Sequence, residues 1–364
     1  MTDIDFERLR SLGLTPAVAA AAAVLTEFDS GAGPMRLVRV TEVHRETVRV
    51  HDGNGDLSAR VLPRLSRALL AAETALAVGD WALMALDPHD QAWVHERVEP
   101  LSHIARRDAD GRRHPVVSNV DWALLVMGLD DDFNLRRLER YLALVQGSGV
   151  TPVVVLTKAD VAARAPEDLQ ARLGAVRARV SAQVDVLAVN ATVAATAQVL
   201  SPYLGAGQTL VLLGSSGAGK STLTNTLLGA AVQDTGAVRE HDSRGKHTTT
   251  SRSLHRLPTG ACVIDTPGLR ALRPDVDEAT LSASFGDIET LAPSCRFRDC
   301  QHMDEPGCAV REGVDGDRLR NYHKLLREAR RDTMSVLERQ QLVAQWKVRG
   351  KAGKARARAK REEL

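Results

Sequence analysis

Short apolar runs separated by turn residues dominate the chain between Met35 and about Glu99. They predict β-strands at Leu37–Val43, Thr47–Val50, Ser58–Val61 and Trp81–Leu86. Turn signals lie between these runs, such as Asp52-Gly53-Asn54-Gly55 and Gly79-Asp80. About five short strands in this stretch predict a small β-barrel, for which the OB-fold is one candidate.

From about Val116 the pattern changes to apolar runs that alternate with helix-like stretches. The apolar runs predict strands at Ala123–Met127, Pro152–Leu156, Val184–Val189 and Thr209–Leu213. The intervening stretches predict helices at Leu135–Gln146, Pro166–Ser181 and Thr192–Leu200. Such alternation is typical of a parallel sheet with helices on both faces, which binds ligands at the carboxyl ends of its strands. The loops after Leu156, Val189 and Leu213 are therefore the expected binding loops.

The sheet pattern stops after Pro274, where a group of Cys and His residues and then a charged helix from Arg318 to about Gln345 follow. The fold class expected from these changes is a multidomain α/β protein. The expected parts are a helical, Ala-rich arm at 1–34, an OB-like barrel at 35–100, an α/β domain at 101–275, a Cys/His and helical domain at 276–343, and a basic, disordered tail at 344–364.

Charge is unevenly distributed along a chain of otherwise ordinary composition. Hydrophobic residues make up 44% and charged residues 26%, which excludes collagen-like and wholly disordered chains. The formal net charge is only +2, yet Ala344–Arg361 contains eight Lys and Arg and no acid. The rest of the chain is therefore acidic overall, and the tail predicts a polyanionic partner such as RNA.

The longest uninterrupted apolar run is Ala17–Leu25, far shorter than the roughly 20 residues of a membrane span. The first ten residues mix acids and bases, unlike a signal peptide. Four cysteines are too few for a disulfide scaffold in a chain of 364 residues. We expect a cytoplasmic, monomeric protein without a membrane partner.

A phosphate-binding loop follows the predicted strand Thr209–Leu213. The pattern G-x-x-x-x-G-K-S leads directly into a predicted helix, Ser221–Leu228, as this motif requires. Its glycines let backbone N–H groups surround phosphate oxygens, the lysine reaches the β- and γ-phosphates, and the serine hydroxyl binds Mg²⁺. The candidate nucleotide contacts are Gly214, Ser215, Ser216, Gly217, Ala218, Gly219, Lys220, Ser221 and Thr222.

Two further segments are candidates for the Mg²⁺ and γ-phosphate contacts. Asp265-Thr266-Pro267-Gly268 ends the apolar run Ala261–Ile264, where the carboxylate suits the outer shell of Mg²⁺ and the Gly268 N–H suits the γ-phosphate. Thr249, or alternatively Thr250, is the expected second Mg²⁺ ligand besides Ser221. Residues 233–247 are rich in Gly, Asp and charge, which is typical of a loop that becomes ordered when GTP binds.

The loop after Leu156 is a candidate for recognising a base. Thr157-Lys158-Ala159-Asp160 resembles the N-K-x-D guanine-reading motif of GTPases. Asp160 would accept hydrogen bonds from guanine N1–H and the 2-amino group, so adenine would leave a buried carboxylate unpaired. Thr157 replaces the usual Asn, which removes some of the hydrogen bonding to the phosphate loop. Asn190-Ala191, after the next strand, is a second candidate base-contacting loop.

The order of these motifs is unusual, because the base-reading loop precedes the phosphate loop. Ordinary GTPases have the phosphate loop first, then D-x-x-G, then N-K-x-D. The sequence therefore predicts a circularly permuted P-loop GTPase domain that binds GTP/GDP. The position of the water-orienting Gln in GTPases like Ras is held here by Leu269, so His247 is the candidate replacement and, with Lys220, the candidate catalytic residue.

Cys295, Cys300, His302 and Cys308 form the pattern Cys-x4-Cys-x-His-x5-Cys. Three thiolates and one imidazole make a closed tetrahedral set, which predicts one structural Zn²⁺. The fourth cysteine, Cys262, lies in an apolar run and is expected in the core.

Taken together, the barrel, the permuted GTPase motifs with G-K-H-T-T-T and D-T-P-G, and the Cys/His pattern resemble the ribosome small-subunit-dependent GTPase A family of bacteria. The resemblance covers about residues 35–330. It implies an N-terminal OB-fold, a central permuted GTPase, a C-terminal zinc domain, and GTP hydrolysis stimulated by the small ribosomal subunit and its rRNA during late assembly. Two other functions remain open: an RNA-binding scaffold whose nucleotide site is mainly structural, and a P-loop kinase, against which Asp160 and D-T-P-G argue.

Overall fold

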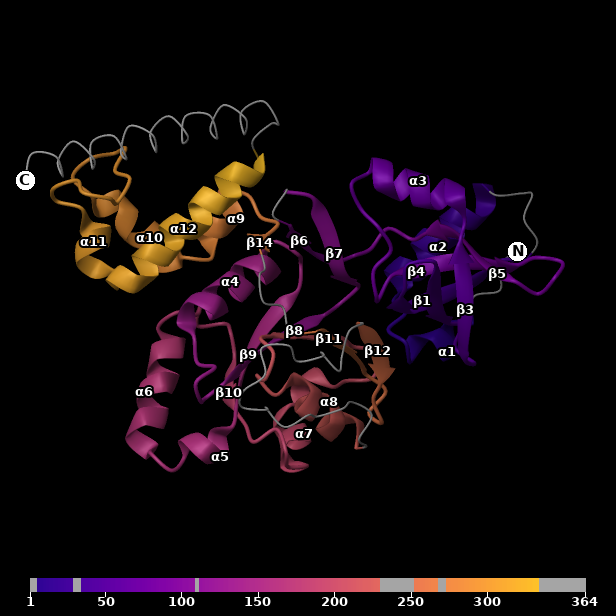
Figure 1. Ribbon diagram of the computed structural model, residues 1–364, viewed down its shortest axis with the longest axis horizontal. Helices are drawn as coiled ribbons and strands as arrows, with labels where there is room; N and C mark the ends of the chain where they lie inside the picture. Colours follow the sequence, from indigo (N-terminus) through magenta and orange to yellow (C-terminus); the bar gives the residue numbers. More distant parts are fainter. Residues whose placement is uncertain (1–4, 29–33, 109–110, 230–251, 268–272, 334–364) are drawn as a thin grey trace, which may run out of the picture. The chain divides into compact units, whose positions relative to one another are not determined.

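The computed structural model describes residues 5–28, 34–108, 111–229, 252–267 and 273–333 (Figure 1). The chain divides into two compact units, 1–275 and 276–364. No helix of the described ranges is both long and apolar enough to cross a bilayer.

The first unit begins with a five-stranded barrel. Its strands are β1 (Arg36–Val43), β2 (Thr47–His51), β3 (Asp56–Val61), β4 (Trp81–Leu86) and β5 (Ala92–Arg97). They pair in the order β1-β2-β3-β5-β4, and β4 closes the ring by pairing with β1. A closed Greek-key ring of five strands is the OB architecture, so this expectation is confirmed.

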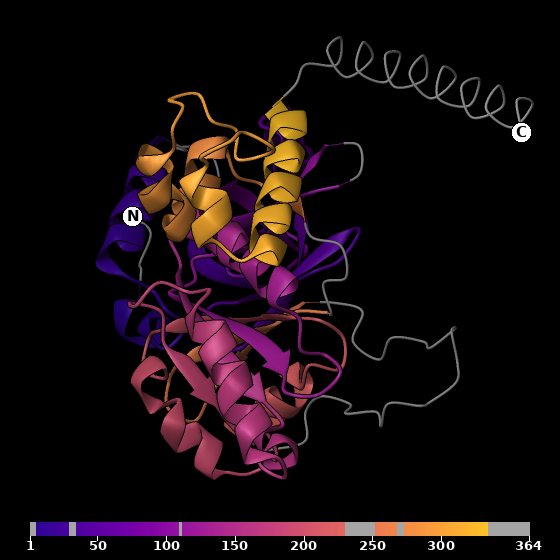
Figure 2. The same cartoon turned by 90° about the vertical axis from the view of Figure 1, so that its left-hand side faces the viewer.

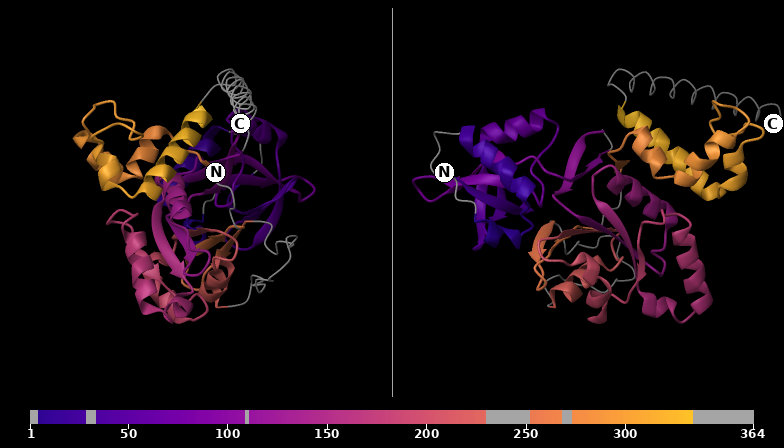
Figure 3. Two further views of the ribbon diagram at one scale, coloured as in Figure 1. Left: turned by 60° about the vertical axis from the view of Figure 1, so that its left-hand side comes forward. Right: turned by 180° about the vertical axis from the view of Figure 1, so that it is seen from behind.

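Two apolar layers explain why β1 and β4 are almost continuously hydrophobic. Val40 and Met84 face the barrel interior, whereas Leu37 and Leu83 face the opposite way, toward the N-terminal helices. These helices, α1 (Phe6–Arg10) and α2 (Pro16–Phe28), lie against the outside of the barrel (Figure 3). The N-terminal segment is therefore part of the barrel's packing. A third helix, α3 (Pro63–Ala71), follows β3.

A mixed sheet forms the second half of this unit. Its strands are β8 (Trp122–Gly128), β9 (Thr151–Thr157), β10 (Val186–Ala188), β11 (Thr209–Gly214), β12 (Ser253–Arg256) and β13 (Cys262–Asp265). The order is β10-β9-β8-β11-β13-β12, in which β12 alone runs antiparallel to its neighbour. The mostly parallel sheet is confirmed.

Helices cover both faces of this sheet (Figures 1 and 2). On one face lie α4 (Leu135–Gln146) and α6 (Pro166–Arg177), whose apolar residues join one core cluster. On the other lie α7 (Ala195–Val199) and α8 (Lys220–Leu228), with a second cluster. The short α5 (Ala159–Ala162) follows β9 directly, and a 3-10 turn, Ser201–Tyr203, precedes β11.

The barrel and the mixed sheet are joined by one strand pair and one buried side chain. Glu42 of β1 pairs with Ser253 of β12, so both sheets form one continuous network of strands. Arg39 of β1 is fully buried; its guanidinium donates to the carbonyls of Leu12 and Asn119 and to Thr209 Oγ1 at 2.9 Å. Because a buried charge needs several partners, this arginine fixes the N-terminal segment, the barrel and the start of β11 together.

A hairpin not expected from the sequence, β6 (His103–Arg107) and β7 (Arg113–Ser118), pairs with the short strand β14 (Arg273–Pro274). Asp275 binds both strands of the hairpin, through Arg107 Nε at 2.7 Å and Arg113 Nε at 2.6 Å. These bonds hold the end of the first unit on the hairpin.

The second unit is helical in its described part. Its helices are α9 (Glu278–Ala283), α10 (Gly286–Leu291), α11 (Ala309–Gly313) and α12 (Gly316–Thr333), with a 3-10 turn at Ala292–Ser294. Phe285 is fully buried, and Arg318 lies over its ring at 4.7 Å while binding Asp287 through two 2.7 Å hydrogen bonds. The described part of this unit, residues 276–333, is short enough that a bound metal ion would add substantially to its stability.

Candidate functional site

The carboxyl ends of four parallel strands bring the nucleotide motifs together. Strand registers place Gly214 of β11 beside Val126 of β8, and Gly128 of β8 beside Thr157 of β9. On the other side of β11, Leu212 lies beside Asp265 of β13. The phosphate loop, the base-reading loop and Asp265 therefore share one edge of the sheet, where α/β proteins bind ligands.

The phosphate loop has the backbone that its glycines require. Gly217 and Gly219 have φ of +81° and +93°, which residues with a side chain rarely adopt. A Cβ at Gly214 would lie 2.4 Å from the Val126 carbonyl oxygen, so the close approach of β8 also requires glycine. Helix α8 begins after Gly219 without a side-chain cap, which leaves its first N–H groups to a phosphate.

Lys220 and Asp265 form the charged centre of the site. Lys220 is 6% exposed, and its Nζ donates to the carbonyls of Ser215 at 2.7 Å and Gly214 at 3.1 Å. Burial lowers the pKa of Lys220, and the charge of Asp265 opposes that shift. Asp265 is 1% exposed; burial raises its pKa, while Lys220 and the Ser221 hydroxyl, 3.4 Å away, lower it.

The Asp265 carboxylate fits a role beside a magnesium ion. Its Oδ1 is buried and has no hydrogen-bond partner among the described residues, while Oδ2 faces the Ser221 hydroxyl. Such an orphaned carboxylate oxygen is costly unless a cation or its water shell satisfies it. Hard oxygen ligands and a nearby phosphate-binding loop are the donor set that Mg²⁺ prefers.

Thr157 connects the base-reading loop with the phosphate loop. Its buried hydroxyl donates to the Ala218 carbonyl at 2.6 Å, and its Oγ1 would lie 3.3 Å from a Cβ at Gly219. The sequence led us to expect some loss of hydrogen bonding where Thr replaces Asn. The structure retains one direct bond between the loops despite that replacement.

Lys158 and Asp160 follow in this loop, and the exposure of Asp160 differs from the expectation. Lys158 has a left-handed backbone, with φ of +60°, and its Nζ lies 2.5 Å from Asp130 Oδ2. Asp160, in α5, is exposed, so the expectation of a buried carboxylate is wrong. Discrimination against adenine by an unpaired Asp160 would require the base itself to cover this side chain.

The second base-contacting candidate lies beside the first. The Ala159 N–H donates to the Val189 carbonyl, which directly precedes Asn190. Asn190 Oδ1 accepts from the Thr192 N–H at 3.0 Å and thereby shapes the turn. The Ala191 carbonyl accepts from Thr226 of α8 at 2.6 Å, which joins this loop to the helix of the phosphate loop.

Two aspartates of the loop after β8 were not expected from the sequence. Asp132 Oδ1 accepts from the Ser215 hydroxyl at 2.5 Å and is also bound by Arg137. Asp130 holds Lys158; burial would raise its pKa, but the hydrogen bond and charge of this lysine keep it below the ordinary value. Three successive aspartates at the end of a strand next to the phosphate-loop strand are the signal that could have revealed them.

Several predicted residues fall outside the described part of the chain. They are His247, Thr249, the alternative Thr250, Gly268 and Leu269. Cys262 is fully buried in β13, as the sequence suggested.

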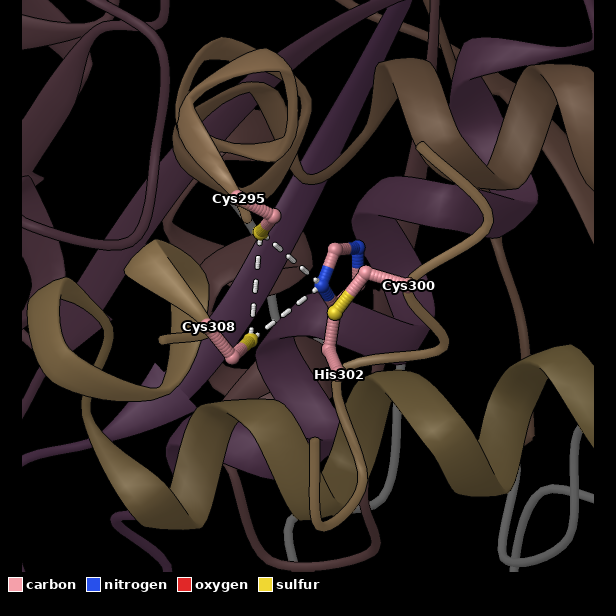
Figure 4. A group of neighbouring side chains, drawn as sticks. All are labelled: Cys295, Cys300, His302 and Cys308. Carbon is pink, nitrogen blue, oxygen red and sulfur yellow. Dashed lines mark hydrogen bonds between the residues drawn. The ribbon is translucent and has the colours of Figure 1, made fainter. Parts of the chain in front are cut away.

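The predicted zinc ligands converge in the second unit (Figure 4). Cys295 Sγ and Cys308 Sγ are 3.9 Å apart, and His302 Nδ1 lies 3.6 and 3.5 Å from them. All four ligand atoms, Cys300 Sγ included, lie within 4.8 Å of one another. Around a tetrahedral zinc ion, two sulfurs lie about 3.8 Å apart and a sulfur and a nitrogen about 3.6 Å apart, so the residues fit Zn²⁺.

This order of strands and motifs defines a circularly permuted P-loop GTPase with an OB barrel. The RsgA GTPase family model matches residues 94–274. The small ribosomal subunit biogenesis GTPase RsgA of Xanthomonas oryzae pv. oryzae (strain MAFF 311018) is 45% identical over 340 residues, covering 89% of this chain and 90% of the relative. The chain therefore belongs to the RsgA GTPase family.

Further relatives agree with this assignment. The small ribosomal subunit biogenesis GTPase RsgA of Xanthomonas campestris pv. campestris (strain B100) is 47% identical over 295 residues, 79% of each chain. The crystal structure of YjeQ from Thermotoga maritima matches with a TM-score of 0.58 at 22% identity, over 81% of this chain and 98% of that one. YloQ, a circularly permuted GTPase, gives 0.54 at 22% identity over 84% and 99%. The two structures support the fold.

Proposed function

We propose that this GTPase acts in late maturation of the small ribosomal subunit, which it contacts through rRNA and which stimulates its GTP hydrolysis. The relatives carry the name of a small ribosomal subunit biogenesis GTPase. The observation that carries the catalytic part is the convergence of the phosphate loop, Thr157 and Asp265 at one sheet edge. A basic tail and an OB barrel are consistent with an RNA partner.

Guanine recognition falls to the loop after β9. Asp160 accepts from N1–H and the 2-amino group, and the stem of Lys158 lies along the base. Asn190 and Ala191 form the neighbouring wall of the base site. The ion pair of Lys158 with Asp130, 2.5 Å long, orients that lysine before nucleotide arrives, which reduces the ordering cost of binding.

The phosphate loop binds the phosphates of GTP or GDP through its backbone N–H groups, from Gly214 to Ser221, with Thr222 next to them. Lys220 offers its ammonium to the β- and γ-phosphates, and the Gly214 and Ser215 carbonyls hold it at the loop. Since the lysine is already buried, little reorganisation accompanies its use. Gly268 contributes a backbone N–H to the γ-phosphate.

Ser221 and Thr249 would hold Mg²⁺, with Asp265 in its outer shell. The ion, when bound, neutralises phosphate charge as it develops during phosphoryl transfer. Lys220 adds a second positive charge at the same phosphates. His247 positions the attacking water, a role that Leu269 cannot fill because its side chain forms no hydrogen bonds.

A Zn²⁺ held by Cys295, Cys300, His302 and Cys308 would supply structural stability to the second unit and no chemistry, because the set leaves no open position. We infer a monomeric, cytoplasmic protein.

The deciding experiment is GTP turnover of the full chain titrated with isolated small ribosomal subunits. We expect turnover to rise with subunit concentration and to saturate, with large subunits as the matched control. Unchanged turnover with bound subunits would favour an RNA-binding scaffold whose nucleotide site is mainly structural.

A further inference from the structure

A cavity of about 600 Å³ lies within the first unit, where the barrel, the β6–β7 hairpin and the start of β12 meet. His44 and Arg45 enter it from the turn between β1 and β2. Arg106 of β6 and His114 of β7 line it from the hairpin, and Arg252 and Pro267 from the GTPase segments. Alanine and valine side chains form most of the remaining wall. The polar side of the cavity is therefore built from cationic residues of three separate elements.

Two of the arginines that line the cavity, Arg106 and Arg252, are close enough for their charges to repel each other. Among the described residues, no acid forms an ion pair with Arg106 or Arg252, and Arg252 Nε is buried without a hydrogen-bond partner. Burial lowers the pKa of Arg252, and the nearby charge of Arg106 lowers it further. Two like charges held together at partial burial are unfavourable unless an anion lies between them.

The nearby acids are engaged elsewhere. Glu42 accepts from His44 Nε2 at 3.1 Å and lies 3.6 Å from Arg49. Asp108 Oδ2 is 2.8 Å from His114 Nε2. Each histidine thus faces its own carboxylate, and the arginines keep an excess of positive charge in the cavity.

We propose that this cavity binds a phosphodiester group of an RNA strand. A guanidinium matches two phosphate oxygens with a rigid fork of donors, and paired arginines are suited to such an anion. The turn between the first two strands of an OB barrel is one of its oligonucleotide-contacting loops, and here that turn supplies His44 and Arg45. No Phe, Tyr or Trp of the described residues lines the cavity, so it offers phosphate binding without a base-stacking platform.

The position of the cavity gives RNA a direct link to the GTP contacts. Arg252 follows Thr249 by three residues, and Pro267 directly precedes Gly268. The proposed Mg²⁺ ligand and the proposed γ-phosphate contact are thus each within a few residues of a side chain that lines the cavity. Because coupling between two ligands is reciprocal, RNA bound here would change the affinity for GTP, and GTP would change the affinity for RNA. This inference rests on the proposed function, since small-subunit rRNA is the source of the phosphodiester.

The test compares the full chain with Arg106→Gln, Arg252→Gln and the double variant. The probe is a fluorescent single-stranded RNA of twelve nucleotides, titrated over a salt series. We expect about tenfold weaker binding per arginine, the effect typical of a lost charged hydrogen bond. The slope of log K against log salt should become shallower by about 0.7 for each lost phosphate contact.

Arg67→Gln is the matched control, because Arg67 is an exposed residue of helix α3 that does not line the cavity, and the substitution removes the same charge. Arg106→Lys should recover part of the affinity, since it restores the charge without the fork. Thermal unfolding of every variant checks the fold. With small subunits, Arg106→Gln should show reduced stimulation of GTP hydrolysis at unchanged basal turnover.

Equal affinity and equal salt slope for the double variant and Arg67→Gln would overturn the proposal. If the double variant lost binding of inorganic phosphate but kept its RNA affinity, the cavity would bind a free anion and the RNA assignment would be wrong. Failure of wild-type turnover to respond to small subunits would refute the proposed function instead, while the oligonucleotide comparison would still decide the cavity.

Discussion

The hydroxyl of Thr157 donates a hydrogen bond to the carbonyl of Ala218, 61 residues further along the chain, at 2.6 Å. The bond joins the base-reading loop after β9 to the phosphate loop after β11. The two loops that we propose to contact the opposite ends of a guanine nucleotide are therefore fixed to each other. This pre-organisation reduces the entropy lost when the nucleotide binds.

Thr157→Val should weaken GDP binding about tenfold, because it removes the donor and leaves a buried carbonyl unpaired. Thr157→Ser keeps the hydroxyl and should bind GDP nearly as well as the wild type. Equilibrium titration with a fluorescent GDP analogue measures both variants. Equal affinities for Val and Ser would mean that the hydrogen bond makes no contribution to nucleotide binding.

Asp132 should act on nucleotide affinity through Ser215. The two side chains are 2.5 Å apart, and Arg137 holds the carboxylate in place. Asp132→Asn and Ser215→Ala should each reduce GTP affinity, and the double variant should be little worse than either single one. A double-mutant cycle should give a coupling energy of about 1 kcal/mol; strictly additive effects would show that the two residues act independently.

Asp160→Asn should change base selectivity as well as affinity. In the proposed base site the carboxylate accepts from two guanine donors, whereas an amide presents one acceptor and one donor. That pair matches N1–H and the 2-oxo group of xanthine, so we expect weaker GTP binding and stronger XTP binding. Competition titrations with GTP and XTP measure the preference, and an unchanged preference would exclude Asp160 from base recognition.

His247→Ala should slow hydrolysis by about 10²-fold with little change in GTP affinity, since a water-positioning group acts on the chemical step. Single-turnover hydrolysis in the presence of small subunits separates this step from binding. His247→Gln provides a comparison that retains a hydrogen-bonding side chain. Wild-type rates in the Ala variant would assign the positioning of water to another residue.

Cys300→Ser should lower zinc content and destabilise the second unit, because metal-binding energy there is folding energy. Metal analysis of the folded wild type should give about one zinc per chain. Cys262→Ser is the control, since Cys262 lies in the core of the first unit. Full zinc content in the Cys300 variant would contradict the four-ligand assignment.

Local signals decided which elements the sequence could predict. Helix α4 has the predicted ends, 135 and 146, because Asn134 caps its start through the Arg137 N–H and Gly147 follows its last turn. Strand β11 is buried on both faces, which gives an uninterrupted apolar run. The β6–β7 hairpin was missed because its strands are polar and depend on pairing with each other and with β14.

The residues of the site likewise fall into those that a local sequence motif predicts and those that only the folded sheet brings together. The residues expected to contact phosphate form a contiguous motif, since one loop must surround one ligand, and spacing alone predicts them. Asp132 contacts Ser215 of that loop, and Asp130 contacts Lys158 of the base-reading loop, both from the loop that follows β8. These partners are brought together only by the order of the strands in the sheet. Asp160 is exposed, and burial set by tertiary packing is not expressed in a short sequence motif.

The pairing of Glu42 with Ser253 has a consequence for dissecting the protein. Strand β12 is the last strand of the mixed sheet, and the barrel protects its outer edge. Excision of residues 1–100 would leave that edge unpaired, a template on which another chain can add a strand. It would also remove Arg39 from the start of β11. A GTPase fragment that begins after residue 100 should therefore form more oligomer as its concentration rises. It should do so although it retains every nucleotide-binding motif.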